Sequence, residues 1–260
     1  MSTNLKLNSV ILGQGATSVV MLHGWGQSLE SFRPLAELLS EHFKVHLIDL
    51  PGFGASSKPE GVWGVDEYSN CIRDYLTENK ISDPIFIGHS FGGRVCVRLV
   101  PKLDNKATAL ILIGAHGLNV SRPTQKSLKI KLISSLRTIV KWIDRNFGTE
   151  IFTKKFVPLF ASRDYLNSGE LRATFVKLVN EDLSEFASQI TAATLLIWGE
   201  NDTEAPPAIG KKYHQLIKNS EYLEFKGKDH FPFNGAGAHL CAFYILNYLK
   251  NLQLRKASNG

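Results

Sequence analysis

Short apolar segments alternate with longer helical patterns along most of this chain, and this alternation limits the folds available to it. Six segments rich in apolar residues have the length of strands: 17–24, 43–50, 84–89, 107–114, 193–200 and 220–225. The middle ones are apolar at nearly every position, which is typical of strands buried on both faces of a parallel sheet. Helical patterns separate them. The sequence therefore predicts an α/β fold with a mostly parallel, doubly wound sheet.

The alternation is interrupted once, between Gly117 and Ala192, where helical patterns follow one another without a convincing strand. We therefore expect a core formed by residues 1–117 and 193–260, with residues 118–192 inserted as a helical cap. An insertion that follows the C-terminal end of a strand lies above the sheet edge where α/β folds bind ligands.

The formal net charge of +6 is unevenly distributed over the 260 residues. Ten lysines and arginines lie between Arg122 and Arg163, against only Asp144 and Glu150. A solvated helix surface accounts for such a run. Two other interpretations of the basic run remain: it binds an anionic substrate or an acidic carrier protein, or it contacts anionic lipid. No basic–aromatic motif suggests nucleic acid.

The remaining composition argues against several classes of protein. No apolar run has the ~20 residues that a membrane span needs, and the start of the chain lacks the pattern of a signal peptide. Cys71, Cys96 and Cys241 have no metal or redox spacing. We expect a cytoplasmic protein without a cofactor or metal, and the oligomeric state stays open.

One serine is enclosed by glycines in Gly88-His89-Ser90-Phe91-Gly92-Gly93. A strand that ends near Gly88 and a helix that begins near Phe91 require a very sharp turn between them. A β-carbon on the flanking residues would clash in such a turn, which explains the glycines. The turn also holds the serine in a strained conformation at the top of the sheet. This pattern is typical of a nucleophile elbow.

A serine hydroxyl needs a base, and the base needs an orienting group. His230 lies between the last expected strand and the final helix, and Asp202 follows the penultimate strand. Both loops are expected at the same sheet edge as Ser90. Glu200 and Glu204 flank Asp202 as alternative acids, whereas Asp229, next to His230, is interpreted as a turn residue.

These motifs resemble those of serine hydrolases with the α/β-hydrolase fold and a helical cap. The similarity extends from about Val19 to Leu249 and rests on "HGWG", "DLPGFGASSKP", "GHSFGG", "WGENDTEAP" and "GKDHFPF". It implies Ser90 as the nucleophile, His230 as the base and Asp202 as the orienting carboxylate. It also implies the backbone amides of Trp25 and Phe91 as oxyanion donors.

Other residues near these motifs are expected to line the pocket or to support the site. His116, at the junction of core and cap, and Phe231 are expected to border a substrate pocket. His23 and His89 are interpreted as hydrogen-bonding supports, and Asp49 as a structural residue.

The expected reaction is cleavage of a carboxylic ester or thioester through an acyl-enzyme. The chain is similar to carboxylesterases, with some likeness to pimeloyl-carrier-protein methyl esterases and to C–C bond hydrolases of ring-cleavage products. The latter usually carry paired glycines where this chain has His23-Gly24, so they are the alternative. A small-molecule receptor with slow turnover is a second alternative, because its triad would look the same.

Overall fold

The computed structural model describes residues 5–119, 124–147, 149–152, 154 and 162–258. The chain forms two compact units, one made of residues 1–119 and 177–260 and the other of residues 120–176. The expected assignment of residues 118–192 to a cap stays a prediction. Arg122 and Lys155 of the basic run lie outside the described residues.

The first unit contains a seven-stranded sheet with the order β1-β3-β2-β4-β5-β6-β7. Its strands are β1 Ser9–Leu12, β2 Ser18–Leu22, β3 Lys44–Ile48, β4 Ile85–His89, β5 Ala109–Ile113, β6 Thr194–Gly199 and β7 Ser220–Phe225. All neighbours pair in parallel except β1, which runs antiparallel to β3 at the edge. The predicted parallel sheet is thus confirmed, whereas β1 was not predicted from the sequence.

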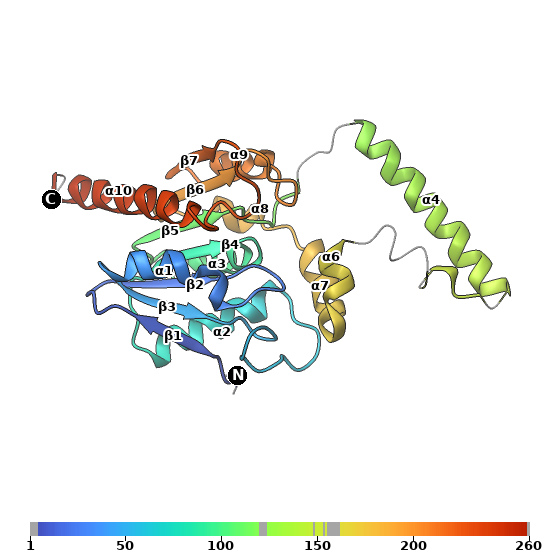
Figure 1. Cartoon of the computed structure of the whole chain (residues 1–260), viewed down its shortest axis with the longest axis horizontal. Helices are drawn as coiled ribbons and strands as arrows, with labels where there is room; N and C mark the ends of the chain where they lie inside the picture. Colours follow the sequence, from blue (N-terminus) through green and yellow to red (C-terminus); the bar gives the residue numbers. More distant parts are fainter. Residues whose placement is uncertain (1–4, 120–123, 148, 153, 155–161, 259–260) are drawn as a thin grey trace. The chain divides into compact units, whose positions relative to one another are not determined.

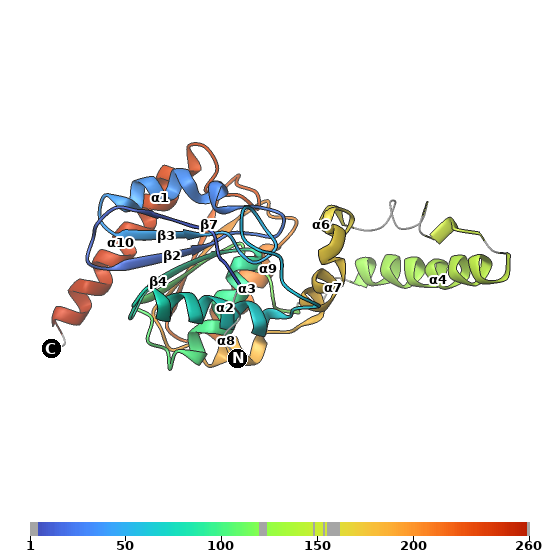
Figure 2. The ribbon, with the colours of Figure 1, turned by 90° about the horizontal axis from the view of Figure 1, so that it is seen from below.

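Helices cover both faces of this sheet, as Figure 2 shows. Helices α1 (Arg33–Ser40) and α10 (Gly237–Ser258) pack together on one face. On the other face α2 (Val65–Glu78) packs against α3 (Phe91–Lys102), which also contacts α8 (Ser184–Ser188), and α9 (Pro207–Leu216) adjoins α8. Burial on both faces explains why the central strands are apolar throughout.

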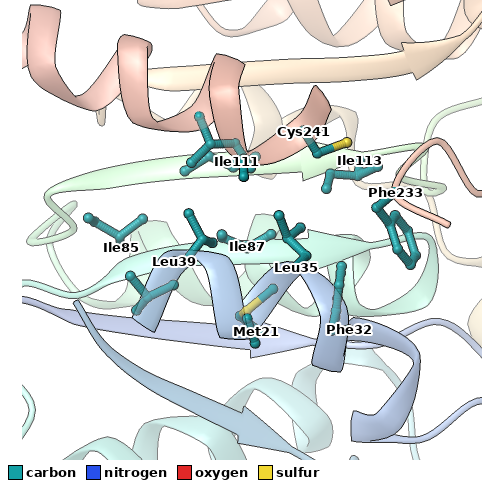
Figure 3. Packing of buried hydrophobic residues seen from close by; sticks show 14 of the residues in the cluster. Met21, Phe32, Leu35, Leu39, Ile85, Ile87, Ile111, Ile113, Phe233 and Cys241 are labelled. Carbon is teal, nitrogen blue, oxygen red and sulfur yellow. The ribbon is translucent and has the colours of Figure 1, made fainter. Parts of the chain in front are cut away.

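A hydrophobic cluster lies between the sheet and the α1–α10 layer (Figure 3). Alternate strand residues such as Met21, Ile87 and Ile111 point into it, because successive side chains of a strand point to opposite faces. Leu35 of α1 and Cys241 of α10 close the cluster from the helix side, and both are fully buried.

Because β2 and β4 to β7 run in parallel, the loops that follow them leave the same edge of the sheet (Figure 1). These loops contain His23 to Gln27 after β2, Ser90 after β4, Gly114 to Gly117 after β5, Glu200 to Ala205 after β6 and Lys226 to Phe233 after β7. This is the edge at which open α/β sheets bind ligands.

The second unit contains α4 (Thr124–Phe147) and α6 (Arg163–Asn167), and α7 (Arg172–Asn180) begins in it. Arg137, Lys141 and Arg145 follow each other at four-residue intervals on α4, and all three are exposed. Within the described part of the chain, no helix is both long and apolar enough to span a bilayer.

Candidate active site

Ser90 occupies the turn between β4 and α3 with a backbone φ of 49° and ψ of −109°. Positive φ is uncommon for a residue with a side chain and usually marks strain or a functional constraint. Two main-chain hydrogen bonds hold the turn: Ser90 N donates to Ile113 O at 3.1 Å, and Gly92 N donates to His23 O at 3.0 Å. The neighbouring strands therefore fix the serine backbone.

The glycines around Ser90 are required by packing within the turn. A β-carbon on Gly88 would lie 2.7 Å from the α-carbon of Gly93, and one on Gly92 would collide with the carbonyl of Leu22. A β-carbon on Gly93 would lie 2.5 Å from the β-carbon of Ala115. The start of α3 approaches β4, the end of β2 and the segment after β5 so closely that only glycine fits at these three positions.

The proposed oxyanion donors lie on two loops that pack against each other. Phe91 is the first residue of α3, and its backbone N–H has no acceptor among the described residues. The rings of Trp25 and Phe91 meet edge to face, with centroids 5.3 Å apart. A free amide at a helix N-terminus favours a developing negative charge.

His230 and Asp202 form a buried hydrogen-bonded pair. His230 Nδ1 lies 2.8 Å from Asp202 Oδ2, and the two residues are 4% and 3% exposed. The other carboxylate oxygen, Oδ1, accepts hydrogen bonds from the backbone N–H groups of Glu204 at 2.9 Å and Ala205 at 2.8 Å. Asp202 is thereby fixed as an acceptor for the imidazole N–H.

The alternative acids occupy different places. Glu200 Oε2 accepts a hydrogen bond from Gly227 N at 2.8 Å, away from the imidazole. Glu204 Oε2 lies 3.6 Å from His230 Nε2, on the opposite side of the ring from Asp202. Asp229 accepts a hydrogen bond from Phe231 N at 2.9 Å, which is the geometry of an aspartate turn.

The segment after β5 joins Ser90 to the His230–Asp202 pair. His116 N donates to Ser90 O at 3.4 Å. Gly114 has a φ of +52°, and a β-carbon there would lie 3.2 Å from both Asp202 Oδ2 and His230 Nδ1. Sequence reasoning missed Gly114, although its place at the end of an apolar strand was the available signal. Ser90 Oγ itself makes no hydrogen bond within the described residues, and such contacts are often long in structures without substrate.

Three further imidazoles surround the site, and burial keeps them uncharged at neutral pH. Burial lowers the pKa of His23 to about 4. Burial, with smaller contributions from His230 and Arg94, lowers the pKa of His116 to about 3. The pKa of His89 falls well below its usual range, because the ring is fully buried and lies beside His230.

His89 and His23 have the supporting contacts expected of them. His89 Nε2 donates to His230 O at 3.0 Å, which ties the elbow to the histidine loop. His23 Nδ1 donates to Gly24 O at 2.7 Å, while Nε2 accepts from Leu50 N at 3.0 Å. Asp49 accepts hydrogen bonds from the backbone N–H groups of Leu29 and Ala55, consistent with a structural residue.

The two expected pocket residues both lie beside His230. The ring centroid of His116 is 5.8 Å from that of His230, and the centroid of Phe231 is 5.1 Å away. Both side chains are partly exposed. Two hollows on the surface lie elsewhere, one between α2 and the start of β4 and the other beside residues 5–9, so neither of them is the expected substrate pocket. In the described chain no cluster of His, Cys, Asp and Glu is arranged to hold a metal ion.

A parallel sheet with a strained serine after its central strand, and a buried His–Asp pair at the same edge, defines the architecture of an α/β hydrolase. Residues 17–163 match the model of the α/β hydrolase fold family, which is more than half of the chain. The chain belongs to this family. It is an enzyme of the hydrolase class, and the expected fold and family resemblance are confirmed.

Curated relatives with similar sequences include esterases. The chain is 29% identical over 221 residues to the pimeloyl-[acyl-carrier protein] methyl ester esterase of Shewanella woodyi, covering 79% of this chain and 82% of the relative. The protein of the same name from Vibrio cholerae is 22% identical over 244 residues, covering 89% and 93%. Among solved structures, the enol-lactonase from Burkholderia xenovorans shares the fold with a TM-score of 0.72 and 22% identity, covering 96% of this chain and 98% of that one.

Proposed function

We propose that this protein hydrolyses carboxylic esters through an acyl-enzyme on Ser90, with His230 as the base and Asp202 as its orienting carboxylate. The observation that supports this most is the 2.8 Å hydrogen bond between His230 and Asp202, beside a serine held at positive φ. A carboxylate on Nδ1 keeps the proton there, which leaves Nε2 free to accept the serine proton.

The proposed reaction proceeds in two halves. Ser90 Oγ attacks the carbonyl carbon, its proton passes to His230 Nε2, and the backbone amides of Phe91 and Trp25 hold the oxyanion. The C–O bond to the alcohol then breaks, and His230 gives its proton to the departing oxygen. Water attacks the acyl carbon while His230 takes one of its protons, and that proton returns to Ser90 as the acid leaves.

Within this class we propose a small alkyl ester of an acyl chain, attached to an acidic carrier protein, as the natural substrate. The names of the curated relatives support this assignment. The exposed row of Arg137, Lys141 and Arg145 on α4 supports it independently, because positive charge favours association with an acidic partner. A thioester is open to the same chemistry.

The test is hydrolysis of p-nitrophenyl acetate, butyrate and octanoate by the wild type and by Ser90→Ala. We expect turnover by the wild type and a loss of about 10³-fold or more in the variant, because the nucleophile is absent. Turnover that survives in Ser90→Ala would contradict the proposal. A wild type that cleaves no ester, but cleaves a vinylogous 1,5-diketone ring-cleavage product, would favour the C–C hydrolase instead. A wild type that is inert to both, yet binds a small molecule, would favour the receptor.

A further inference from the structure

The loop after β6 presents two carboxylates to one imidazole. Asp202 contacts His230 Nδ1 at 2.8 Å, and Glu204 Oε2 lies 3.6 Å from Nε2. Their surroundings differ sharply: the Asp202 side chain is fully buried, whereas the Glu204 side chain is 53% exposed. Glu204 therefore lies near Nε2, the ring nitrogen that transfers the proton in the proposed reaction, and about half of its side chain is open to solvent.

The position of Glu204 follows from the turn that holds Asp202. Asp202 Oδ1 accepts hydrogen bonds from the backbone N–H groups of Glu204 and Ala205. The same short turn therefore fixes the Glu204 backbone and holds Asp202 against the ring. Glu200, at the start of this loop, contacts Gly227 N instead, so a nearby glutamate serves as a matched control.

The chemistry places the departing alcohol beside Glu204. His230 Nε2 must give its proton to the oxygen of the leaving group, so that group lies next to Nε2 when the ester bond breaks. In the described part of the chain no lysine or arginine pairs with Glu204. His89 and His116, whose rings lie beside that of His230, are uncharged at neutral pH because burial lowers their pKa values. The negative charge of Glu204 is therefore not neutralised by these neighbours.

We propose that Glu204 is a specificity-determining residue that selects esters by the charge of the alcohol they release. Cationic leaving groups are favoured and anionic ones are disfavoured, while small neutral alcohols are accepted. This inference rests on the proposed ester hydrolysis and adds the class of leaving group to it. A methyl ester, which releases a neutral alcohol, satisfies the same rule.

The size of the effect follows from Coulomb's law near a protein surface. Charges about 7 Å apart at an effective dielectric constant near 20 change a rate by well over tenfold. Solvent exposure and salt reduce this, so we expect about fivefold for each unit of charge on the leaving group.

The experiment compares three esters that share one acyl group. This acyl group is the one carried by the p-nitrophenyl ester that the wild type hydrolyses fastest. Their alcohols are choline, its uncharged isostere 3,3-dimethylbutanol, and the anionic 2-hydroxyethanesulfonate. We measure kcat/KM for the wild type, Glu204→Gln, Glu200→Gln and Ser90→Ala, at low and high ionic strength. Ratios between esters are compared across enzymes, so the intrinsic reactivity of each ester cancels.

In Glu204→Gln we expect the ratio of choline ester to neutral ester to fall about fivefold, and the ratio of anionic ester to neutral ester to rise about fivefold. High salt should move both ratios in the wild type toward those of the variant, so that the choline ratio falls and the anionic ratio rises, and Glu200→Gln should keep the wild-type ratios. A purely structural role would change all three esters equally. Unchanged ratios in Glu204→Gln, with hydrolysis lost in Ser90→Ala, would overturn this inference alone. Hydrolysis that persists in Ser90→Ala, or that is absent in the wild type, would overturn the proposed function as well.

Discussion

Two loops at one edge of the sheet are held in place by different forces. The serine turn after β4 is fixed by exclusion of side chains, since β-carbons on Gly88, Gly92 or Gly93 would meet neighbouring atoms. The acid loop after β6 is fixed by hydrogen bonds, because the Asp202 carboxylate accepts them from two backbone N–H groups and from the imidazole of His230. Substitutions in the first loop should therefore damage folding, and those in the second should damage chemistry.

The largest effect is expected from Asp202→Asn in the acid loop. An amide can present its N–H to His230 Nδ1 and stabilise the wrong tautomer, so kcat should fall by roughly 10³–10⁴-fold. The thermal midpoint should change little if the loop keeps its turn. Steady-state kinetics and a melting curve on the same sample check both statements. Glu200→Gln is the control, with kcat within about twofold of the wild type, and an equal loss there would contradict the assignment of Asp202.

In the serine turn, Gly92→Ala should destabilise the fold by roughly 2–3 kcal/mol, because the new β-carbon meets the carbonyl of Leu22. Urea unfolding measures this difference. Gly227→Ala separates the clash from the backbone effect: Gly227 has a φ of +70° but nothing within 4 Å of its β-carbon position. It should cost only about 1 kcal/mol. Equal losses for the two variants would show that close packing is not what fixes the serine turn.

The smallest effect is expected on the stability of the fold at acidic pH. It arises from the uncharged histidines that contact the serine turn. The folded-state pKa is about 4 for His23 and about 3 for His116, against an ordinary value of 6.5. Below pH 6.5 the unfolded chain therefore binds more protons, and stability falls as the pH falls. Each histidine contributes at most about 1.4 kcal/mol per pH unit.

Urea unfolding at pH 7, 6 and 5 should show a shallower pH dependence for His116→Gln than for the wild type. The exposed His42→Gln should keep the wild-type slope. If His116→Gln lost stability with falling pH as steeply as the wild type does, the account of His116 as a neutral group in the folded state would be wrong.

The contrast between the loops also explains what could be predicted from the sequence. A steric constraint leaves glycines at fixed positions, so the turn around Ser90 was predictable. Buried parallel strands leave apolar runs, and strands β2 to β6 were predictable for that reason. Strand β7, with the sequence SEYLEF, was also predicted, although most of its side chains are only partly buried or exposed. Strand β1 was not, because an antiparallel edge strand with partly exposed side chains carries a weak pattern.

The contacts of a hydrogen-bonded loop are harder to predict from the sequence than a steric constraint. Glu200, Asp202 and Glu204 are all acidic and close together, and only the structure shows which atom each one contacts. Gly114 was missed because its role depends on Asp202 and His230, which lie in the loops after β6 and β7 and approach Gly114 only in the fold. The basic run between Arg122 and Arg163 predicts a charged helix surface, yet its partner is not encoded in the spacing of its lysines and arginines.

The proposed mechanism requires Ser90 to be an activated nucleophile. The most direct measurement is labelling with an alkyl p-nitrophenyl phosphonate, followed by mass spectrometry of the digested protein. We expect one nitrophenol released per chain and a stable phosphonyl group on the peptide that contains Ser90. Labelling should be slower in Asp202→Asn and absent in Ser90→Ala. Labelling at another residue, or labelling of Ser90→Ala at the wild-type rate, would contradict the proposed mechanism.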